Sequence, residues 1–282
     1  MKYGFPHEKS KNAITRWHNR VIAHNKQSID AQKHFDPDAD FWEGLSRQFR
    51  DDPFRQNDPV LKRLICEFHD CETILDIGGG AGRFALPLAL LKESVTVADP
   101  SPSMLNELAE SSAAANIKNV RSVQTLWEEA SLPIHDGILC SHVTYGIENI
   151  EDFIRKLNCH ANKKIVLLSF MESPQTHLSM IWEAIHGEKR IHLPGVPELM
   201  DVLWELNFIP ELSLLERRKA PVYESEQEAL NNLRSSLYVD TGSEKDYMLM
   251  SSVEQHLEYE KGGLSLTGSR ERVLCLINWN IN

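Results

Sequence analysis

Short apolar runs alternate with amphipathic stretches from residue 61 to the end of the chain. The runs have the length of buried strands, whereas the stretches carry apolar residues at helical spacing. The pattern predicts strands at 73–77, 95–98, 119–123, 137–140, 164–170, 210–220 and 272–277. It predicts helices at 61–68, 84–91, 103–115, 150–157, 179–186 and 198–206. This alternation indicates an α/β fold with a parallel sheet covered by helices on both faces.

Two segments lie outside this alternation. Residues 1–60 are polar and aromatic and predict a helical N-terminal extension, in which Trp17, Val21 and Ile22 are spaced for one helix face. Residues 40–49 predict a second short helix there. Residues 61–282 form the main domain, and a helical insertion is expected at about 223–262, before the last strand.

The strongest motif is a glycine run between the strand at 73–77 and the next helix. Glycines at such a turn let the backbone pass close to a ligand, and the helix N-terminus offers free N–H groups. A dinucleotide fingerprint fits only from Gly80, two glycines late, and ends at Ala85. The pattern Asp-x-Gly-x-Gly-x-Gly fits more fully, and its members are Asp76, Gly78, Gly80 and Gly82.

This motif, together with Asp99 at the end of the next strand, resembles class I S-adenosylmethionine (SAM)-dependent methyltransferases. The resemblance covers about residues 61–170 and implies a Rossmann-like sheet whose last strand is antiparallel. It implies methyl transfer from SAM, with S-adenosylhomocysteine (SAH) as the product. In related enzymes a helical N-terminal extension covers SAM and the acceptor. Here its aromatic residues either form such a lid or pack against the core.

The resemblance also implies roles for single residues. Asp76 matches the acidic residue near the methionine amino group, and Gly78 and Gly80 match glycines under the methionine and ribose portions. Asp99 matches the carboxylate that accepts both ribose hydroxyls, a role for which its two oxygens suit it.

Further residues are assigned to the adenine and to the methyl group. The segment expected to flank the adenine contains Pro100, Ser101 and Met104. Many relatives carry an Asp after the third strand, where this chain has Leu126, so Trp127 is expected either to pack against the adenine or to lie in the core. Ser141 ends the fourth strand, beside the expected position of the transferred methyl group.

Candidates for contact with the acceptor follow the fourth and fifth strands. His142 and Tyr145 are expected to face the methyl group, with His142 as a general base, a hydrogen-bond partner or a loop residue. His177 and Trp182 are expected to border the acceptor. The histidines of this region do not have the spacing of a metal site, so no metal is expected.

Composition narrows the class of partner. The net charge of −11 argues against a nucleic-acid surface, and the Asn/Asp-Pro-Pro-Tyr motif of many base methyltransferases is missing. A small-molecule acceptor is therefore expected. The alternatives are a non-catalytic SAM-binding protein and a protein methyltransferase. The oligomeric state cannot be derived from the sequence.

The chain also carries signals about its location. Its five cysteines contain no C-x-x-C pair, and no apolar run is long enough to span a membrane. The N-terminus has no apolar signal core. These features predict a cytoplasmic protein with reduced thiols and no membrane partner.

Overall fold

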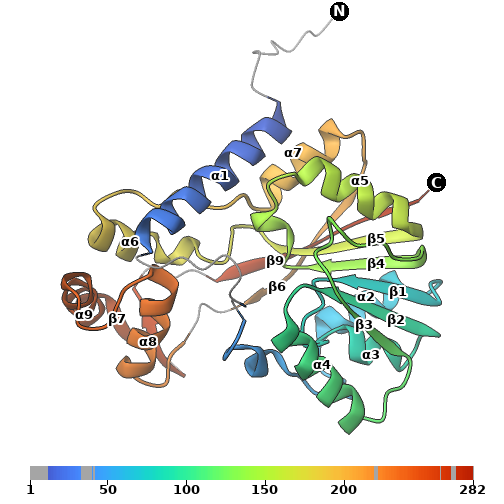
Figure 1. Cartoon of the computed structure of the whole chain (residues 1–282), viewed down its shortest axis with the longest axis horizontal. Coiled ribbons are helices and arrows are strands. Elements are labelled where there is room, and N and C mark those ends of the chain that lie inside the picture. The colour runs from blue at the N-terminus through green and yellow to red at the C-terminus, as the bar shows by residue number, and fades with distance from the viewer. Residues whose placement is uncertain are drawn as a thin grey trace, which may run out of the picture.

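The computed structural model describes residues 12–32, 40, 42–218, 222–260, 262–267 and 271–281. Within them, seven strands form one sheet in the order β3-β2-β1-β4-β5-β9-β6 (Figure 1). The strands are β1 Thr73–Ile77, β2 Ser94–Asp99, β3 Val120–Gln124, β4 His135–Ser141, β5 Ala161–Phe170, β6 Glu211–Arg218 and β9 Arg272–Asn280. The longer helices are α1 Ala13–Ala31, α2 Pro59–Glu67, α4 Pro102–Ala114, α5 Ile150–His160, α6 Ser179–His186, α7 Val196–Glu205, α8 Glu226–Leu237 and α9 Glu244–His256.

The sheet is mostly parallel, as expected. β1 pairs with β2 and β4, and the outer pairs β2–β3 and β4–β5 are parallel too. The last strand, β9, is antiparallel to both β5 and β6 and lies between them. The carboxyl ends of β1, β2, β4 and β5 therefore lie at one edge of the sheet, together with the beginning of β9.

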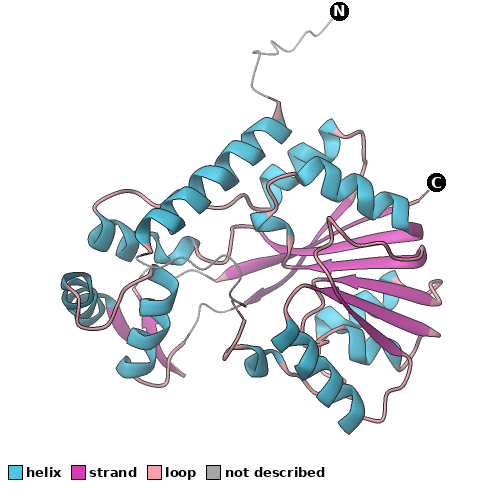
Figure 2. Ribbon diagram, in the orientation of Figure 1, coloured by secondary structure: helices cyan, strands magenta, loops and turns pink. Residues whose placement is uncertain are grey.

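Helices cover both faces of the sheet (Figure 2). One apolar cluster joins α1, α5 and α7 to one face, and its members include Trp17, Leu75 and Ile277. A second cluster joins α2, α4 and the short helix α3 Ala85–Ala89 to the other face, with Ile74 and Val97 at its centre. The sheet is buried on both faces, which explains why its strands read as continuous apolar runs.

A third apolar cluster lies apart from the sheet. It joins α6 to α8 and α9 through Trp182, Leu233 and Leu249. The helices α8 and α9 follow β6 and precede β9, where the sequence predicts a helical insertion. The insertion also contains a hairpin that the pattern does not predict, formed by β7 Leu257–Glu260 and β8 Gly263–Leu266.

The N-terminal part differs from its prediction in detail. Trp17 and Val21 are buried, but Ile22 is exposed, because α1 turns that position away from the sheet. The second expected helix is only a 3-10 turn at Ser46–Phe49. His34 and Phe35 of the N-terminal extension lie outside the described residues.

Two findings concern the expected environment of the chain. Among the described helices, none combines the length and the apolar character needed to cross a membrane. All five cysteines are free thiols, and Cys71, Cys140 and Cys275 are buried in the core.

Candidate functional site

The glycine loop crosses the carboxyl edge of the sheet directly after β1. Gly78 and Gly82 have φ values of +66° and +82°, in the left-handed region that glycine adopts without strain. A Cβ atom at Gly78 would overlap Val143, and one at Gly82 would overlap Leu108. The loop therefore needs glycine both for its backbone conformation and for its close packing.

Asp99 ends β2 and holds the loop. Its Oδ2 accepts a hydrogen bond from the Gly80 N–H at 2.9 Å, and its Oδ1 accepts one from the Ser101 N–H at 2.9 Å. Burial raises the pKa of Asp99, although these hydrogen bonds oppose the shift. Ser101 in turn caps α4 by accepting from the Met104 N–H.

Asp76 lies in β1 and is fully enclosed. Its Oδ1 is buried and has no hydrogen-bond partner among the described residues. Burial, with a smaller contribution from the charge of Asp99, raises the pKa of Asp76 to about 8. A buried polar atom without a partner is costly, so this oxygen marks a place where a ligand group would be stabilising.

A cavity of about 380 Å³ opens between these carboxyl groups and the end of β4. Its lining contains the glycine loop and apolar side chains from distant segments. The residues are Trp42, Phe49, Asp76, Gly78, Gly79, Gly80, Ala81, Arg83, Phe84, Asp99, Pro100, Met104, Ser141, His142, Val143, Leu168 and Leu274. We call this space the cofactor cavity.

The N-terminal segment supplies one wall of the cofactor cavity. The rings of Trp42 and Phe49 pack edge to face, with centroids 5.1 Å apart. Asp40 accepts hydrogen bonds from the hydroxyls of Ser101 and Ser103 at 2.9 and 2.6 Å. Arg50 pairs with Glu107 and Glu110 of α4. The wall is thus tied to α4 on both sides of its aromatic pair.

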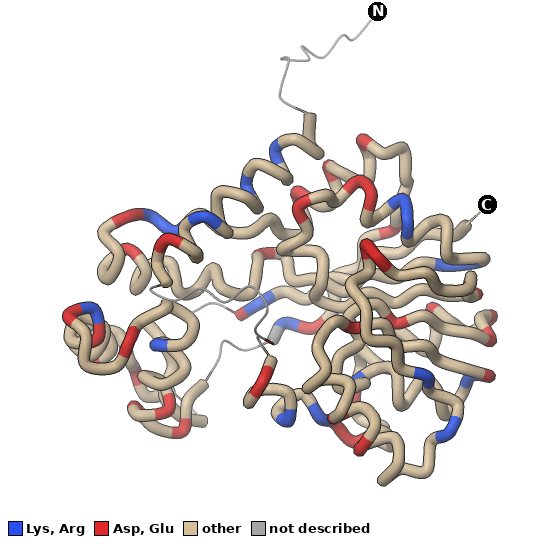
Figure 3. Tube along the Cα trace, viewed as in Figure 1, with Lys and Arg blue, Asp and Glu red and all other residues tan. Residues whose placement is uncertain are grey.

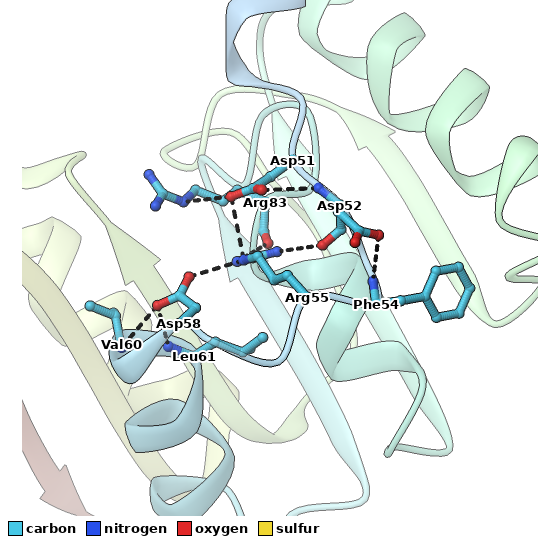
Figure 4. Close-up of polar contacts among 8 residues, drawn as sticks. All are labelled: Asp51, Asp52, Phe54, Arg55, Asp58, Val60, Leu61 and Arg83. Carbon is cyan, nitrogen blue, oxygen red and sulfur yellow. Dashed lines mark hydrogen bonds and ion pairs between the residues drawn. The ribbon is translucent and has the colours of Figure 1, made fainter.

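A polar cluster joins the same segment to the glycine loop (Figure 4). Arg55 Nε forms ion pairs with Asp51 at 3.3 Å and with Asp58 at 3.0 Å. Arg55 Nη2 donates to the Arg83 carbonyl at 2.8 Å, where the glycine loop ends. Asp58 also caps α2, because its Oδ1 accepts from the N–H groups of Val60 and Leu61.

The loop after β4 presents His142 to the cofactor cavity. Its φ of +60° is unusual for a non-glycine residue, and strain of this kind often accompanies function. The imidazole lies 4.6 Å from the ring of Phe170, between centroids, and its Nδ1 lies 3.1 Å from the Tyr145 hydroxyl. Tyr145 is itself buried, and its hydroxyl accepts from the Phe170 N–H at 2.5 Å. It therefore positions His142 instead of lining the cavity.

A second cavity, also of about 380 Å³, lies at the same edge of the sheet. Its lining comes from the segment after β5, from α6 and from the start of β9. The residues are Met171, Glu172, Ser173, Pro174, Thr176, His177, Ser179, Met180, Thr267, Glu271, Arg272 and Val273. We call it the second cavity. It contains His177, as the sequence predicts for the acceptor region, but that role stays a prediction.

Besides Tyr145, which does not line the cavity, three expected contacts are corrected by the structure. Leu126 is about half exposed and Trp127 is buried against Phe153 and His160, so neither lines the cofactor cavity. Trp182 stacks on His186 within the third apolar cluster and lines neither cavity. Each tryptophan is held by the core instead, which was the competing interpretation for Trp127.

The remaining predicted residues do come together. Asp76, Gly78, Gly80, Asp99, Pro100, Met104, Ser141 and His142 all line the cofactor cavity. Gly82 shapes the turn behind it, and Ser101 acts through the α4 cap. Sequence reasoning missed Asp40, Arg55, Arg83 and Arg272. Of these four, only Arg83 carried a local signal, since it directly follows the glycine motif. No group of metal-ligating side chains is present among the described residues.

Comparison with protein families agrees with this geometry. Residues 74–163 match the family model described as a methyltransferase domain. The match begins in β1 and ends in β5, so it contains the glycine loop, Asp99 and the loop after β4.

Curated relatives match parts of the chain. An uncharacterized protein of Haemophilus influenzae is 30% identical over 149 residues, which cover 51% of this chain and 54% of the relative. The ubiquinone biosynthesis O-methyltransferase of Rickettsia felis is 32% identical over 104 residues, covering 36% of this chain and 42% of the relative. The chain thus matches about half or less of the length of these relatives.

Solved structures share the fold at low sequence identity. The YcgJ protein of Bacillus subtilis has a TM-score of 0.52 and 12% identity, with 80% of this chain and 99% of that one covered. A candidate methyltransferase of Bacillus halodurans has a TM-score of 0.53 and 12% identity, with 78% and 95% covered. These likenesses confirm the expected Rossmann-like sheet. The similarity to the methyltransferase-domain family thus lies in residues 74–163, the part of the chain that contains the glycine loop.

Proposed function

We propose that this chain transfers a methyl group from SAM to a small-molecule acceptor. One observation carries the proposal: two buried carboxyl groups, Asp76 and Asp99, converge on a cavity lined by a glycine loop. The cavity lies at the carboxyl edge of a parallel sheet, where ligands of such folds bind.

The residues of the cofactor cavity fit SAM. The buried Oδ1 of Asp76 is an acceptor suited to the ammonium group of the methionine portion. Each oxygen of Asp99 accepts one backbone N–H and keeps capacity for a ribose hydroxyl. A Cβ at Gly80 would extend toward Met104 and Asp99, so glycine preserves the room for a ligand there.

Bound SAM supplies an activated methyl group on a sulfonium sulfur. The chain's own residues bind and orient the reactants, which is where much of the rate of such a displacement arises. His142 is held between Phe170 and Tyr145, so its ring can orient an acceptor by a hydrogen bond at the cavity wall. Trp42 and Phe49 exclude water from the same space.

Several observations favour a small acceptor over nucleic acid. The chain has a net charge of −11, and lysines and arginines lie among aspartates and glutamates on the same elements (Figure 3). Nucleic-acid surfaces depend instead on gathered basic residues. The relatives do not decide which atom is methylated. Those of Rickettsia are named for O-methyl transfer, and one of Zymomonas mobilis is named for C-methyl transfer.

Labelled SAM tests the proposal directly. The chain is incubated with methyl-labelled SAM and cell extract, and the label is followed into low-mass and macromolecular fractions. We expect label in low-mass products, and less of it with the Asp99→Ala variant. Label in protein alone would favour a protein methyltransferase. SAM binding without transfer to any fraction would favour a binding protein.

A further inference from the structure

The ring of Phe170 contacts residues of both cavities. His142, which lines the cofactor cavity, has its ring centroid 4.6 Å from that of Phe170. The guanidinium carbon of Arg272, which lines the second cavity, lies 4.7 Å from the same centroid. The second cavity therefore lies close to the cofactor cavity, at the same edge of the sheet.

His177 offers this cavity a hydrogen-bond acceptor. Its Nδ1 lies 2.8 Å from the Pro174 carbonyl oxygen, which can only accept, so the ring proton is on Nδ1. Burial lowers the pKa of His177, and the charge of Arg272 lowers it further, so the ring is neutral at neutral pH. The lone pair is then on Nε2, which has no hydrogen-bond partner among the described residues.

Arg272 determines which donor can approach that lone pair. Its guanidinium carbon lies 4.7 Å from the ring centroid of Phe170, and its charge reaches His177. Two acidic residues, Glu172 and Glu271, also line the cavity, but both are exposed and Glu271 pairs with Arg217 at 3.9 Å. A cation beside His177 disfavours an ammonium group there, whereas a neutral hydroxyl can donate to Nε2.

The remaining lining suits an apolar body. Met171, Pro174, Met180 and Val273 contribute hydrophobic surface, and the hydroxyls of Thr176 and Ser179 are already hydrogen-bonded within the segment. We propose that the second cavity holds the methyl acceptor and that His177 Nε2 accepts a hydrogen bond from it. The acceptor is then a hydroxyl-bearing apolar molecule without a cationic amine. This inference rests on the proposed methyl transfer.

Two probes with the same carbon skeleton test the class of acceptor. Benzyl alcohol presents a neutral hydroxyl, and benzylamine presents an ammonium group at neutral pH. Each is titrated into the SAH-saturated chain carrying nitrogen-15-labelled histidine. We expect NMR to show His177 with its proton on Nδ1, and benzyl alcohol to shift its Nε2 resonance. Benzylamine should bind roughly tenfold more weakly or worse, as expected for loss of a hydrogen bond to a buried acceptor.

His135 serves as an internal reference. Its Nδ1 faces the Pro133 carbonyl at 2.9 Å, so it has the same ring-proton position, but its Nε2 contacts Thr96 away from both cavities. Its resonances should not respond to benzyl alcohol. A proton on Nε2 of His177, equal binding of the two probes, or an unmoved His177 would each overturn the inference.

Variants separate recognition from folding. His177→Gln keeps an acceptor oxygen near the position of Nε2 and should retain most of the benzyl alcohol affinity. His177→Phe should lower that affinity roughly tenfold. Equal affinities in the two variants would contradict the role of Nε2, and if either fails to fold, the wild-type titration still decides.

Calorimetry of SAH binding distinguishes failure of this inference from failure of the proposed function. Failure to bind SAH counts against the proposed function, whereas SAH binding with an unresponsive His177 counts only against this inference.

Discussion

Asp76 is a buried residue whose Oδ1 has no hydrogen-bond partner among the described residues. Its folded pKa of about 8 lies above the ordinary value of 3.8, so folding favours the protonated form. The contribution of Asp76 to stability is therefore present below pH 3.8 and is lost as the pH rises toward 8. Pairing with an ammonium group requires the ionised form of Asp76. Ligand affinity is therefore expected to rise with pH over the range in which this contribution to stability is lost.

We predict that SAH affinity rises with pH up to about 8 and that Asp76→Asn removes most of this rise. The variant should also gain stability relative to the wild type between pH 4 and pH 8, by on the order of 1–3 kcal/mol at the upper end. Calorimetry of SAH binding and thermal unfolding, each across this pH range, provide the measurements. An affinity in the wild type that does not change with pH would contradict the role of Asp76.

Asp99 is predicted to hold the ribose. Asp99→Ala removes the acceptors for two hydroxyls, so SAH affinity should fall by on the order of 1–3 kcal/mol of binding free energy. Because Asp99 also holds Gly80 and Ser101, Asp40→Ala is the matched control: it removes hydrogen bonds to the same turn without touching the ribose position. If the two variants bind SAH with the same affinity, Asp99 acts only by holding the loop.

His142 is the residue at which turnover and cofactor binding should separate. His142→Ala should lower the single-turnover rate of methyl transfer while leaving SAH affinity nearly unchanged, because Asp76 and Asp99, and not this ring, are proposed to hold the cofactor. Tyr145→Phe should give a smaller loss, since it removes only the hydroxyl near Nδ1. A general base would contribute ~10²–10⁴-fold and a rate that rises through the imidazole pKa. Wild-type rates in both variants would remove this loop from the reaction.

At the scale of elements, the segment 42–58 connects α4 to the glycine loop. Arg50 holds it to α4 and Arg55 holds it to the Arg83 carbonyl, so a ligand that orders the loop should also order the segment. We predict that SAH slows hydrogen exchange of amides in 42–58, and that Arg55→Ala reduces this protection. Lys26→Ala, which removes an exposed ion pair on α1, is the control. Equal exchange with and without SAH would make the segment only a scaffold.

The elements themselves were largely predictable, because strand and helix periodicity is a local property of the chain. The glycine motif and Asp99 were also predictable, since they lie within 25 residues of each other and follow consecutive strands. Arg272 was not, because it reaches the site only through the pairing of β9 with β5. Trp127 was left open between the adenine and the core, and Trp182 was misplaced, for a related reason. Whether an aromatic ring faces a ligand or the core depends on packing between segments distant in sequence.

At the scale of the whole molecule, the apolar clusters on the sheet are separate from the cluster of α6, α8 and α9. Leu233→Ala should lower the free energy of unfolding by about 2–5 kcal/mol, since Leu233 is fully buried. SAH affinity should not change, because this cluster does not line the cofactor cavity. Leu108→Ala, behind Gly82, should reduce both quantities. Chemical unfolding and calorimetry check the pair, and a loss of SAH affinity in Leu233→Ala would contradict the separation.

The position of β9 has a consequence for the order of synthesis. Among the described strands, β6 pairs only with β9, so it stays unpaired until residues 272–280 have left the ribosome. The same late strand carries Leu274 to one cavity and Arg272 to the other. A nascent chain can thus complete the glycine loop while its acceptor side is still open. During that interval, β5 and β6 present exposed edges on which a chaperone or another nascent chain could act.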